Sequence, residues 1–505
     1  MASAEPPAGE RPRSHSYAQI LRSAALIGGS SVITVMVSIV RVKVMALLLG
    51  PAGVGLLGVF SSLQELAQSV AGLGVNSSGV RQVAEAAATG EERRIARTAA
   101  VLRRTSVVLG LVGATVLIGF RAQLSEWTFQ SPRFAGPIAL LSLAVLLRVA
   151  SDGQGAVIQG MRRIGDVARI AVFAAVAGTL AGLGFVYVLR EDGVVPMLIC
   201  IAAASLLFSW HYRRKIALPP VSLTRSEVRR EAGALLTLGF AFMASAVLTT
   251  AAAYVIRALV TRSEGLEAAG LYQAAWSLGG LYVGFILQAM GTDFYPRLTA
   301  VAHDHPQCNR LVNEQTQVGL LLGGPGVLAT LTFAPLVIGI FYTGRFVEAV
   351  EPLRWVCLGM ALRVAVWPMG YIVLAKNARS IFLATEIAAT VVHVGLAWLL
   401  VRGYGVTGAA MAFFGLYLWH GCIIYLVARR MTGFRWSVAN LQAGGLLVVS
   451  AVVVFFASRW GSGLMAPFVA TAALIAVAAY SAWQLSRIMP LGASFRAITR
   501  PGKRI

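Results

Sequence analysis

The chain has 505 residues, of which 57% are hydrophobic and 13% charged, and its mean hydropathy is +0.73. Soluble domains carry about 25% charged residues, so this composition excludes a large globular enzyme and predicts a membrane protein. The net charge of +22 could indicate nucleic-acid binding. That function needs basic residues gathered on one soluble face, whereas here they separate apolar runs.

Hydrophobic stretches follow one another along almost the whole chain. Residues 1–19 are rich in Pro, Ser and Arg and are predicted to be a disordered tail. No small-residue cleavage site follows, so the first hydrophobic stretch is expected to remain as an anchor. Fourteen stretches reach the roughly 20 residues that cross a bilayer. They lie at 21–49, 52–75, 99–120, 137–159, 168–189, 194–212, 232–260, 266–292, 316–341, 353–375, 380–401, 406–428, 441–458 and 466–486. The sequence therefore predicts an all-α polytopic membrane protein of about fourteen transmembrane helices.

The distribution of Lys and Arg predicts the orientation of these helices. With both termini in the cytoplasm, 30 of the 43 Lys and Arg residues fall in cytoplasmic segments, eight fall outside and five lie within the hydrophobic stretches. Cytoplasmic loops are the ones enriched in Lys and Arg. The basic character thus reports topology, and nucleic acid is not expected as a partner.

The chain also repeats itself at an offset of about 215 positions. "LRVA" occurs at 147–150 and at 362–365, and "GLLGVFSSL" from Gly55 matches "GLYQAAWSL" from Gly270. "YVLREDGVV" from Tyr187 matches "LLVRGYGVT" from Leu399, at an offset of 212. Repeats of six helices predict two pseudo-symmetric lobes with a substrate site between them. We expect an N-lobe at 20–231, a C-lobe at 232–430, and two appended helices with a basic tail at 431–505.

Five cations interrupt the hydrophobic stretches, and a charge near a helix centre costs roughly 2.5–3.5 kcal/mol. They are Arg41, Lys43, Arg148, Arg257 and Arg363. Offsets of 216 and 215 pair Arg41 with Arg257 and Arg148 with Arg363. Singly, Arg257 could snorkel to the interface and Arg148 could pair with Asp152 at i+4. The recurrence of these arginines in both halves favours a cavity lined by positive charge. The planar guanidinium group fits the oxygens of phosphate or pyrophosphate, and a carboxylate is the alternative ligand.

The second stretch has a polar face at helical spacing, formed by Ser61, Gln64 (or Glu65) and Gln68. Tyr272, Gln273 and Trp276 are the rough counterparts in the eighth stretch. These residues could contact a glycan or could hydrogen-bond neighbouring helices. Gln64 and Gln68 join the four arginines as candidate substrate ligands.

Carboxylates are rare in the hydrophobic stretches, and the sequence reading counts Glu65 and Asp152 as the deep ones. Glu65 is the candidate site for proton or cation coupling, with an ion pair to Lys43 or Arg41 as the alternative. His393 and His420 are lone histidines, which are expected to be packed or hydrogen-bonded rather than to carry protons. No catalytic group is predicted.

No metal or cofactor is predicted either. "HDHPQC" at 303–308 gathers possible ligands, but it lacks a second ligand pair at zinc spacing. The four cysteines do not form an outward-facing pair, so no disulfide framework is expected.

Three stretches carry a resemblance to a known family. "LLLGPAGVGLLGVFSSL", "GLYQAAWSLGGLYVGFILQAMGTDFYPRLTAV" and "GYIVLAKNARSIFLATEIAATVVHVGLAWLLVRGYGVTGAAMA" make residues 20 to 430 similar to Wzx-type oligosaccharide flippases. The wider superfamily includes MATE exporters and MurJ-like flippases. The resemblance implies an undecaprenyl-pyrophosphate-linked glycan as substrate, moved from the inner to the outer leaflet of a bacterial plasma membrane by alternating access. Membrane lipids and polysaccharide assembly proteins would be further partners. Wzx proteins typically have twelve helices, whereas fourteen are predicted for this chain. That number is closer to the number in MurJ-like proteins.

Two other functions of the same fold stay open. A MurJ-like flippase would carry lipid II, and a MATE-like multidrug or cation antiporter would show an excess of carboxylates in its cavity. A membrane glycan polymerase or ligase ranks last, because no outward loop is long enough to hold a catalytic site.

Overall fold

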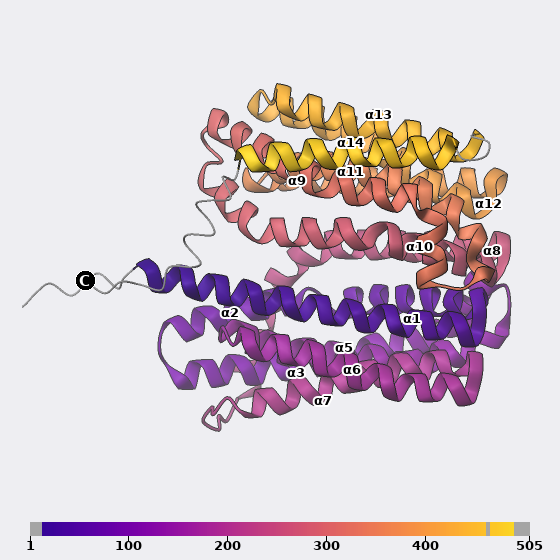
Figure 1. The fold of residues 1–505 in the computed structure, drawn as a ribbon. Helices are drawn as coiled ribbons and strands as arrows, with labels where there is room; N and C mark the ends of the chain where they lie inside the picture. The colour runs from indigo at the N-terminus through magenta and orange to yellow at the C-terminus, as the bar shows by residue number, and fades with distance from the viewer. Residues whose placement is uncertain (1–12, 461–464, 489–505) are drawn as a thin grey trace, which may run out of the picture. The chain divides into compact units, whose positions relative to one another are not determined.

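The computed structural model describes residues 13–460 and 465–488, and every regular element within them is a helix (Figure 1). The α-helices are α1 (Arg13–Gly72), α2 (Val75–Ala88), α3 (Glu92–Gly119), α4 (Arg121–Phe129), α5 (Ala135–Gly160), α6 (Ile164–Leu189), α7 (Val194–Arg214), α8 (Arg225–Ala300), α9 (His305–Thr332), α10 (Ala334–Phe341), α11 (Val350–Ala375), α12 (Arg379–Thr432), α13 (Val438–Trp460) and α14 (Met465–Ile488). Short 3-10 helices lie at Pro132–Phe134, Arg190–Gly193 and Gly344–Ala349. The all-helical prediction is confirmed. Helix α1 begins inside the tail predicted to be disordered, while residues 1–12 and the basic tail 489–505 lie outside the described residues.

Nine helices of the described chain are long and apolar enough to cross a membrane, or ten if the bent pair α9–α10 is one span. The protein is thus a multi-pass membrane protein. The number differs from fourteen because four of the nine segments are 45 to 54 residues long, enough for two crossings each. These are Gly28–Gly72, Ile164–Arg214, Met243–Gly291 and Arg379–Thr432. Fourteen crossings therefore stays a prediction.

Each of the four long segments contains a backbone break. Gly50 in α1, Gly265 in α8 and Gly405 in α12 leave the helical conformation with φ of 67°, 87° and 55°. Glycine adopts this left-handed region without a Cβ penalty, which explains the residue type at each break. In the fourth segment the 3-10 turn Arg190–Gly193 separates α6 from α7.

The backbone repeats at the spacing seen in the sequence. Helices α5 and α11 are equal in length, with 26 residues each. The first positions of α5 and α11 are offset by 215, and so are those of α6 and α12. Positive φ recurs at the same interval, at Gly50 and Gly265, Arg162 and Asn377, and Arg190 and Gly405. Arg148 and Arg363 hence occupy the same position in α5 and α11.

Arg41 and Arg257 do not share this register. The breaks at Gly50 and Gly265 are offset by 215, whereas the two arginines are offset by 216. Counted back from its break, Arg41 therefore corresponds to Ile256. One residue along a helix turns a side chain by about 100°. The sequence pairing of Arg41 with Arg257 is thus one residue out of step with the backbone repeat.

Two glycines bring backbone segments into direct contact. A Cβ on Gly55 would meet the carbonyl oxygen of Leu266 and, at 2.9 Å, the nitrogen of Gly270. A Cβ on Gly270 would meet the carbonyl oxygen of Pro51 and, at 3.1 Å, the nitrogen of Gly55. Small residues of this kind let helix backbones approach closely in membrane proteins.

The chain forms two compact units that interleave along the sequence. Unit 1 comprises Met1–Val44, Leu63–Ser125 and Arg133–Val247, and unit 2 comprises Met45–Ser62, Glu126–Pro132 and Leu248–Ile505. Their bounds differ from the sequence-based lobes at 20–231 and 232–430, because each unit takes part of α1 and part of α8.

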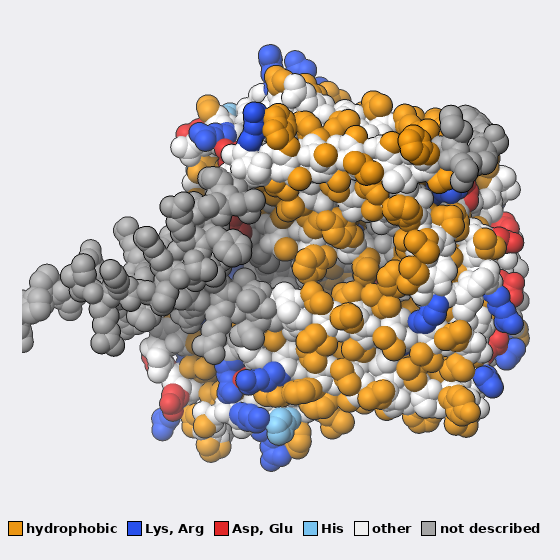
Figure 2. Space-filling model, viewed as in Figure 1, with side chains coloured by type: hydrophobic (Ala, Val, Ile, Leu, Met, Phe, Trp, Pro, Cys, Tyr) orange, Lys and Arg blue, Asp and Glu red, His pale blue; other side chains and the backbone are white. Residues whose placement is uncertain are grey.

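Within unit 1, α5 packs against α3 and α7, and α7 against α6 (Figure 1). Its core includes Val83, Leu102 and Val157. Within unit 2, α11 packs against α9 and α12, and its core includes Phe294, Ile372 and Phe434. On the face drawn in Figure 2, hydrophobic side chains cover most of the length of the helices, and most Lys and Arg side chains lie towards the helix ends.

Two helix starts carry the expected capping chemistry. Thr224 and Glu227 form a capping box at the start of α8, with the Thr224 N–H donating to Glu227 Oε2 at 2.9 Å. This backbone hydrogen bond holds the pKa of Glu227 below its usual value. Asp304 caps α9 by accepting from the N–H of Gln307 at 2.9 Å. The "HDHPQC" stretch is thus a helix start.

Candidate functional site

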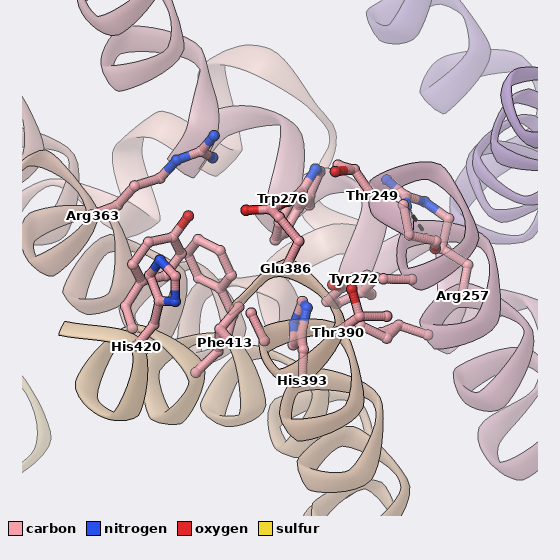
Figure 3. A pocket seen from close by; sticks show the side chains of 16 residues that line it. Thr249, Arg257, Tyr272, Trp276, Arg363, Glu386, Thr390, His393, Phe413 and His420 are labelled. Carbon is pink, nitrogen blue, oxygen red and sulfur yellow. Dashed lines mark hydrogen bonds between the residues drawn. The ribbon is translucent and has the colours of Figure 1, made fainter. Parts of the chain in front are cut away.

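A cavity of about 190 Å³ lies among α8, α11 and α12 of unit 2 (Figure 3). Its walls are helix faces with three-to-four spacing, which places the side chains of each set on one side. Helix α8 contributes Thr249, Ala252, Ala253, Ile256, Arg257, Tyr272 and Trp276, α11 contributes Arg363, and α12 contributes Glu386, Ala389, Thr390, His393, Phe413, Leu416, Tyr417 and His420.

Arg257 is fixed in the wall of this cavity. Only 8% of the residue is exposed, its Nε donates to Gln273 Oε1 at 2.8 Å, and its Nη1 donates to the carbonyl oxygen of Ala253 at 2.9 Å. The guanidinium carbon lies 5.9 Å from the centre of the Tyr272 ring, a cation–π contact. These contacts hold the guanidinium in one orientation and remove the need for snorkelling.

Arg363 reaches the same cavity from α11. Its guanidinium lies 5.9 Å from the centre of the Tyr417 ring, and its buried Nε lacks a hydrogen-bond partner among the described residues. The residue at i+4 is Trp367, which packs on Tyr371 with ring centres 4.6 Å apart. The i+4 position after Arg363 thus holds an aromatic residue and not a carboxylate.

One carboxylate and two histidines of α12 share the cavity with the arginines. Glu386 points into the middle of the cavity between Arg363 and Arg257 (Figure 3). His393 is 8% exposed, and its Nε2 is buried without a hydrogen-bond partner in the described part of the chain. The His420 ring lies 6.2 Å from that of Tyr417.

Sequence reasoning missed Glu386 as a deep carboxylate and treated the two histidines as packing residues. Glu386 lies inside the predicted span 380–401, and His393 follows it at i+7 on the same helix face. This spacing is the signal that could have identified the set, although it does not reveal that Arg257 and Arg363 lie opposite.

Arg148 lies in unit 1 in a different environment. Its Nε is 3.7 Å from Asp152 Oδ1, and its Nη1 donates to Ser205 Oγ at 3.2 Å. Gln68 donates to the other carboxylate oxygen of Asp152. Two cavities adjoin Asp152, of about 230 and 370 Å³, and Arg148 lines the larger one. Gln68 and Arg148 thus both contact the Asp152 carboxylate, one at each oxygen.

The remaining predicted residues lie apart from these three cavities. Arg41 donates from Nη2 to Ser38 Oγ at 3.1 Å, and Gln64, half-buried, and Glu65, exposed, lie on the following part of α1. None of Arg41, Gln64 and Glu65 is among the residues that line the cavities around Arg148, Asp152 or Arg363. The described residues include no cluster of three His, Cys, Asp or Glu side chains that could hold a metal ion.

Known proteins similar to this chain are membrane transporters. The family model described as "Polysaccharide biosynthesis protein" matches residues 44–351. The lipid III flippase of Escherichia coli (strain K12) is 23% identical over 404 residues, which cover 77% of this chain and 94% of that protein. The lipid III flippase of Shigella flexneri matches to the same extent.

Solved structures share the fold. An inward-facing multidrug resistance transporter of the MATE family superposes with a TM-score of 0.67 at 15% identity, covering 79% of this chain and 95% of that one. The lipid II flippase MurJ in an inward closed conformation gives 0.67 at 11% identity, covering 92% and 99%. The resemblance seen in the sequence is thereby confirmed.

Proposed function

Because the chain belongs to the polysaccharide biosynthesis protein family, we propose that it is a flippase for an undecaprenyl-pyrophosphate-linked oligosaccharide. It would move this lipid from the inner to the outer leaflet of a bacterial plasma membrane by alternating access. The similarity to lipid III flippases over 94% of their length supports this substrate class. The chain would cross the membrane fourteen times, with both termini in the cytoplasm. Its two repeats would form the two lobes on either side of the substrate path.

The cavity of unit 2 carries the proposal, because it pairs two arginines with aromatic side chains. Arg257 and Arg363 present planar donor groups that fit phosphoryl oxygens in pairs. Tyr272, Trp276 and Tyr417 offer ring faces on which sugar rings can pack. A cation antiporter would need more carboxylates than arginines, and this cavity has one carboxylate against two arginines.

A reconstituted flipping assay tests the proposal. Vesicles containing the purified chain receive a short-chain polyprenyl-pyrophosphate glycan, lipid II or a cationic drug, and transfer between leaflets is measured for each. The glycan is expected to be moved by the wild type and by Arg402→Ala, a control in α12 whose guanidinium stacks on Trp398 at 4.0 Å. Arg257→Ala with Arg363→Ala should stop the transfer. Movement of lipid II or of the drug alone would replace the proposal with that function.

A further inference from the structure

One carboxylate shares the arginine cavity, so an anion bound to the arginines would lie beside it. Glu386 lies between Arg363 and Arg257 (Figure 3), and Tyr417 lines the same cavity. The formal charges of the substrate-free cavity are thus two positive and one negative. Nearby cations favour the charged form of a carboxyl group.

A bound pyrophosphate diester would change this balance. It carries two negative charges that stay ionised at neutral pH, since each phosphoryl group has one acidic oxygen. With two arginines and two phosphoryl charges in the same small cavity, an ionised Glu386 becomes a third anion. A like charge at short range disfavours the ionised form of a carboxyl group.

We propose that Glu386 is the counter-anion of the substrate-free cavity, and that it takes up one proton from water when a pyrophosphate group binds to Arg257 and Arg363. No bond of the substrate is made or broken, and the proton adds to a carboxylate oxygen. This inference rests on the proposed function, because it takes pyrophosphate as the guest. It assigns Glu386 a role in setting substrate affinity.

Other titratable groups face the same space and must be separated from Glu386. Besides Arg257 and Arg363, they are Tyr272 of α8 and His393, Tyr417 and His420 of α12. Tyrosine hydroxyls are already protonated at neutral pH and cannot take up a proton. A histidine that became charged beside the phosphoryl groups would produce uptake of the same sign. The variants therefore have to include both histidines.

The linkage has a defined sign. If the complex holds one more proton than the separate partners, affinity rises as the pH falls. The dissociation constant should then change by about tenfold per pH unit over the range in which one full proton is taken up. Replacing Glu386 with Gln removes the titrating group and the competing charge. That variant should bind more tightly than the wild type at high pH and should lose the pH dependence.

Calorimetry on the full-length chain in detergent tests this linkage. The probe is a pyrophosphate diester with a geranyl chain on one side and one N-acetylglucosamine on the other. Binding is measured from pH 6 to 8.5 in PIPES and in Tris, whose different ionisation enthalpies reveal proton uptake. Glu386→Gln should abolish uptake, whereas Glu386→Asp, which keeps a carboxyl group, should retain it. His393→Gln and His420→Gln should also retain it.

The outcomes separate the two claims. Wild-type binding without proton uptake, or uptake that survives in Glu386→Gln, would overturn the role of Glu386. Loss of uptake in a histidine variant with retention in Glu386→Gln would move the role to that histidine. Equal binding of the probe by the wild type and by Arg363→Ala would instead refute the proposed function.

Discussion

Arg148 and Arg363 hold the same position in the repeat and have different neighbours. The residue at i+4 is Asp152 in α5 and Trp367 in α11. Arg148 is therefore paired with a carboxylate and a serine, while Arg363 faces Tyr417 and a cavity that contains a second arginine. The duplicated position thus holds an arginine paired with a carboxylate of its own helix in unit 1, and an arginine that shares a cavity with Arg257 and Glu386 in unit 2.

The largest difference should appear when each arginine is shortened. Under the proposed function, Arg363→Ala would remove two charge-assisted hydrogen bonds to a phosphoryl group, worth about 1.5–3 kcal/mol each. Glycolipid transfer in the reconstituted assay should therefore fall at least about 100-fold. Arg148→Ala should reduce it by less than about tenfold, because Asp152 already neutralises much of that charge. Equal loss in both variants would show that the two arginines play one role, and the difference in neighbours would then carry no functional meaning.

A double substitution sharpens the assignment of Arg148 as a pairing residue. Arg148→Gln alone leaves Asp152 with only Gln68 as its hydrogen-bonding neighbour among the contacts described above, which should lower the melting temperature. Arg148→Gln with Asp152→Asn removes both charges and should restore most of the stability. Because the Arg148 side chain is 40% exposed, the coupling should be about 1 kcal/mol or less. A thermal melt of the purified variants measures it. A double variant less stable than Arg148→Gln would argue against the pairing role.

The smallest effect concerns a break at which the repeats differ in residue type. Arg190 has φ 55° and ψ −125°, close to the conformation of Gly405, with φ 55° and ψ −138°. A non-glycine residue in this region costs about 1–3 kcal/mol. Arg190→Gly should therefore stabilise the protein by about 1 kcal/mol and leave transfer unchanged. Leu189→Gly, at φ −94°, is the matched control and should destabilise it. Similar melting shifts for both would exclude the strain at Arg190.

Much of the fold could be predicted from the sequence, because hydrophobic length and the internal repeat are local or collinear signals. The all-helical membrane class and the equivalence of Arg148 and Arg363 follow from them. The fourteen predicted crossings do not match the helices one to one. Helices α1, α8 and α12 each contain two successive hydrophobic stretches, separated only by a break at Gly50, Gly265 or Gly405.

The site could be predicted only in part. The arginines were identifiable because a charge in an apolar stretch is conspicuous. Glu386 is equally conspicuous inside the predicted span 380–401 and was overlooked, whereas its position opposite Arg257 of α8 and Arg363 of α11 could not be read from the sequence. The pairing of Arg41 with Arg257 lies one residue out of step with the backbone repeat, a shift that hydropathy cannot detect but that turns a helical side chain by about 100°.

The contact at Gly55 and Gly270 has a meaning for the history of the chain. Gly55 approaches Leu266, Gly270 approaches Pro51, and Leu266 is the repeat equivalent of Pro51, just as Gly270 is that of Gly55. Each partner thus uses the same surface as the other, which is the defining property of an isologous interface between identical subunits. A half-length ancestor carrying one repeat would have met a second copy of itself through this glycine. The covalent fusion of two copies would then have freed their equivalent positions, Arg148 and Arg363 among them, to diverge.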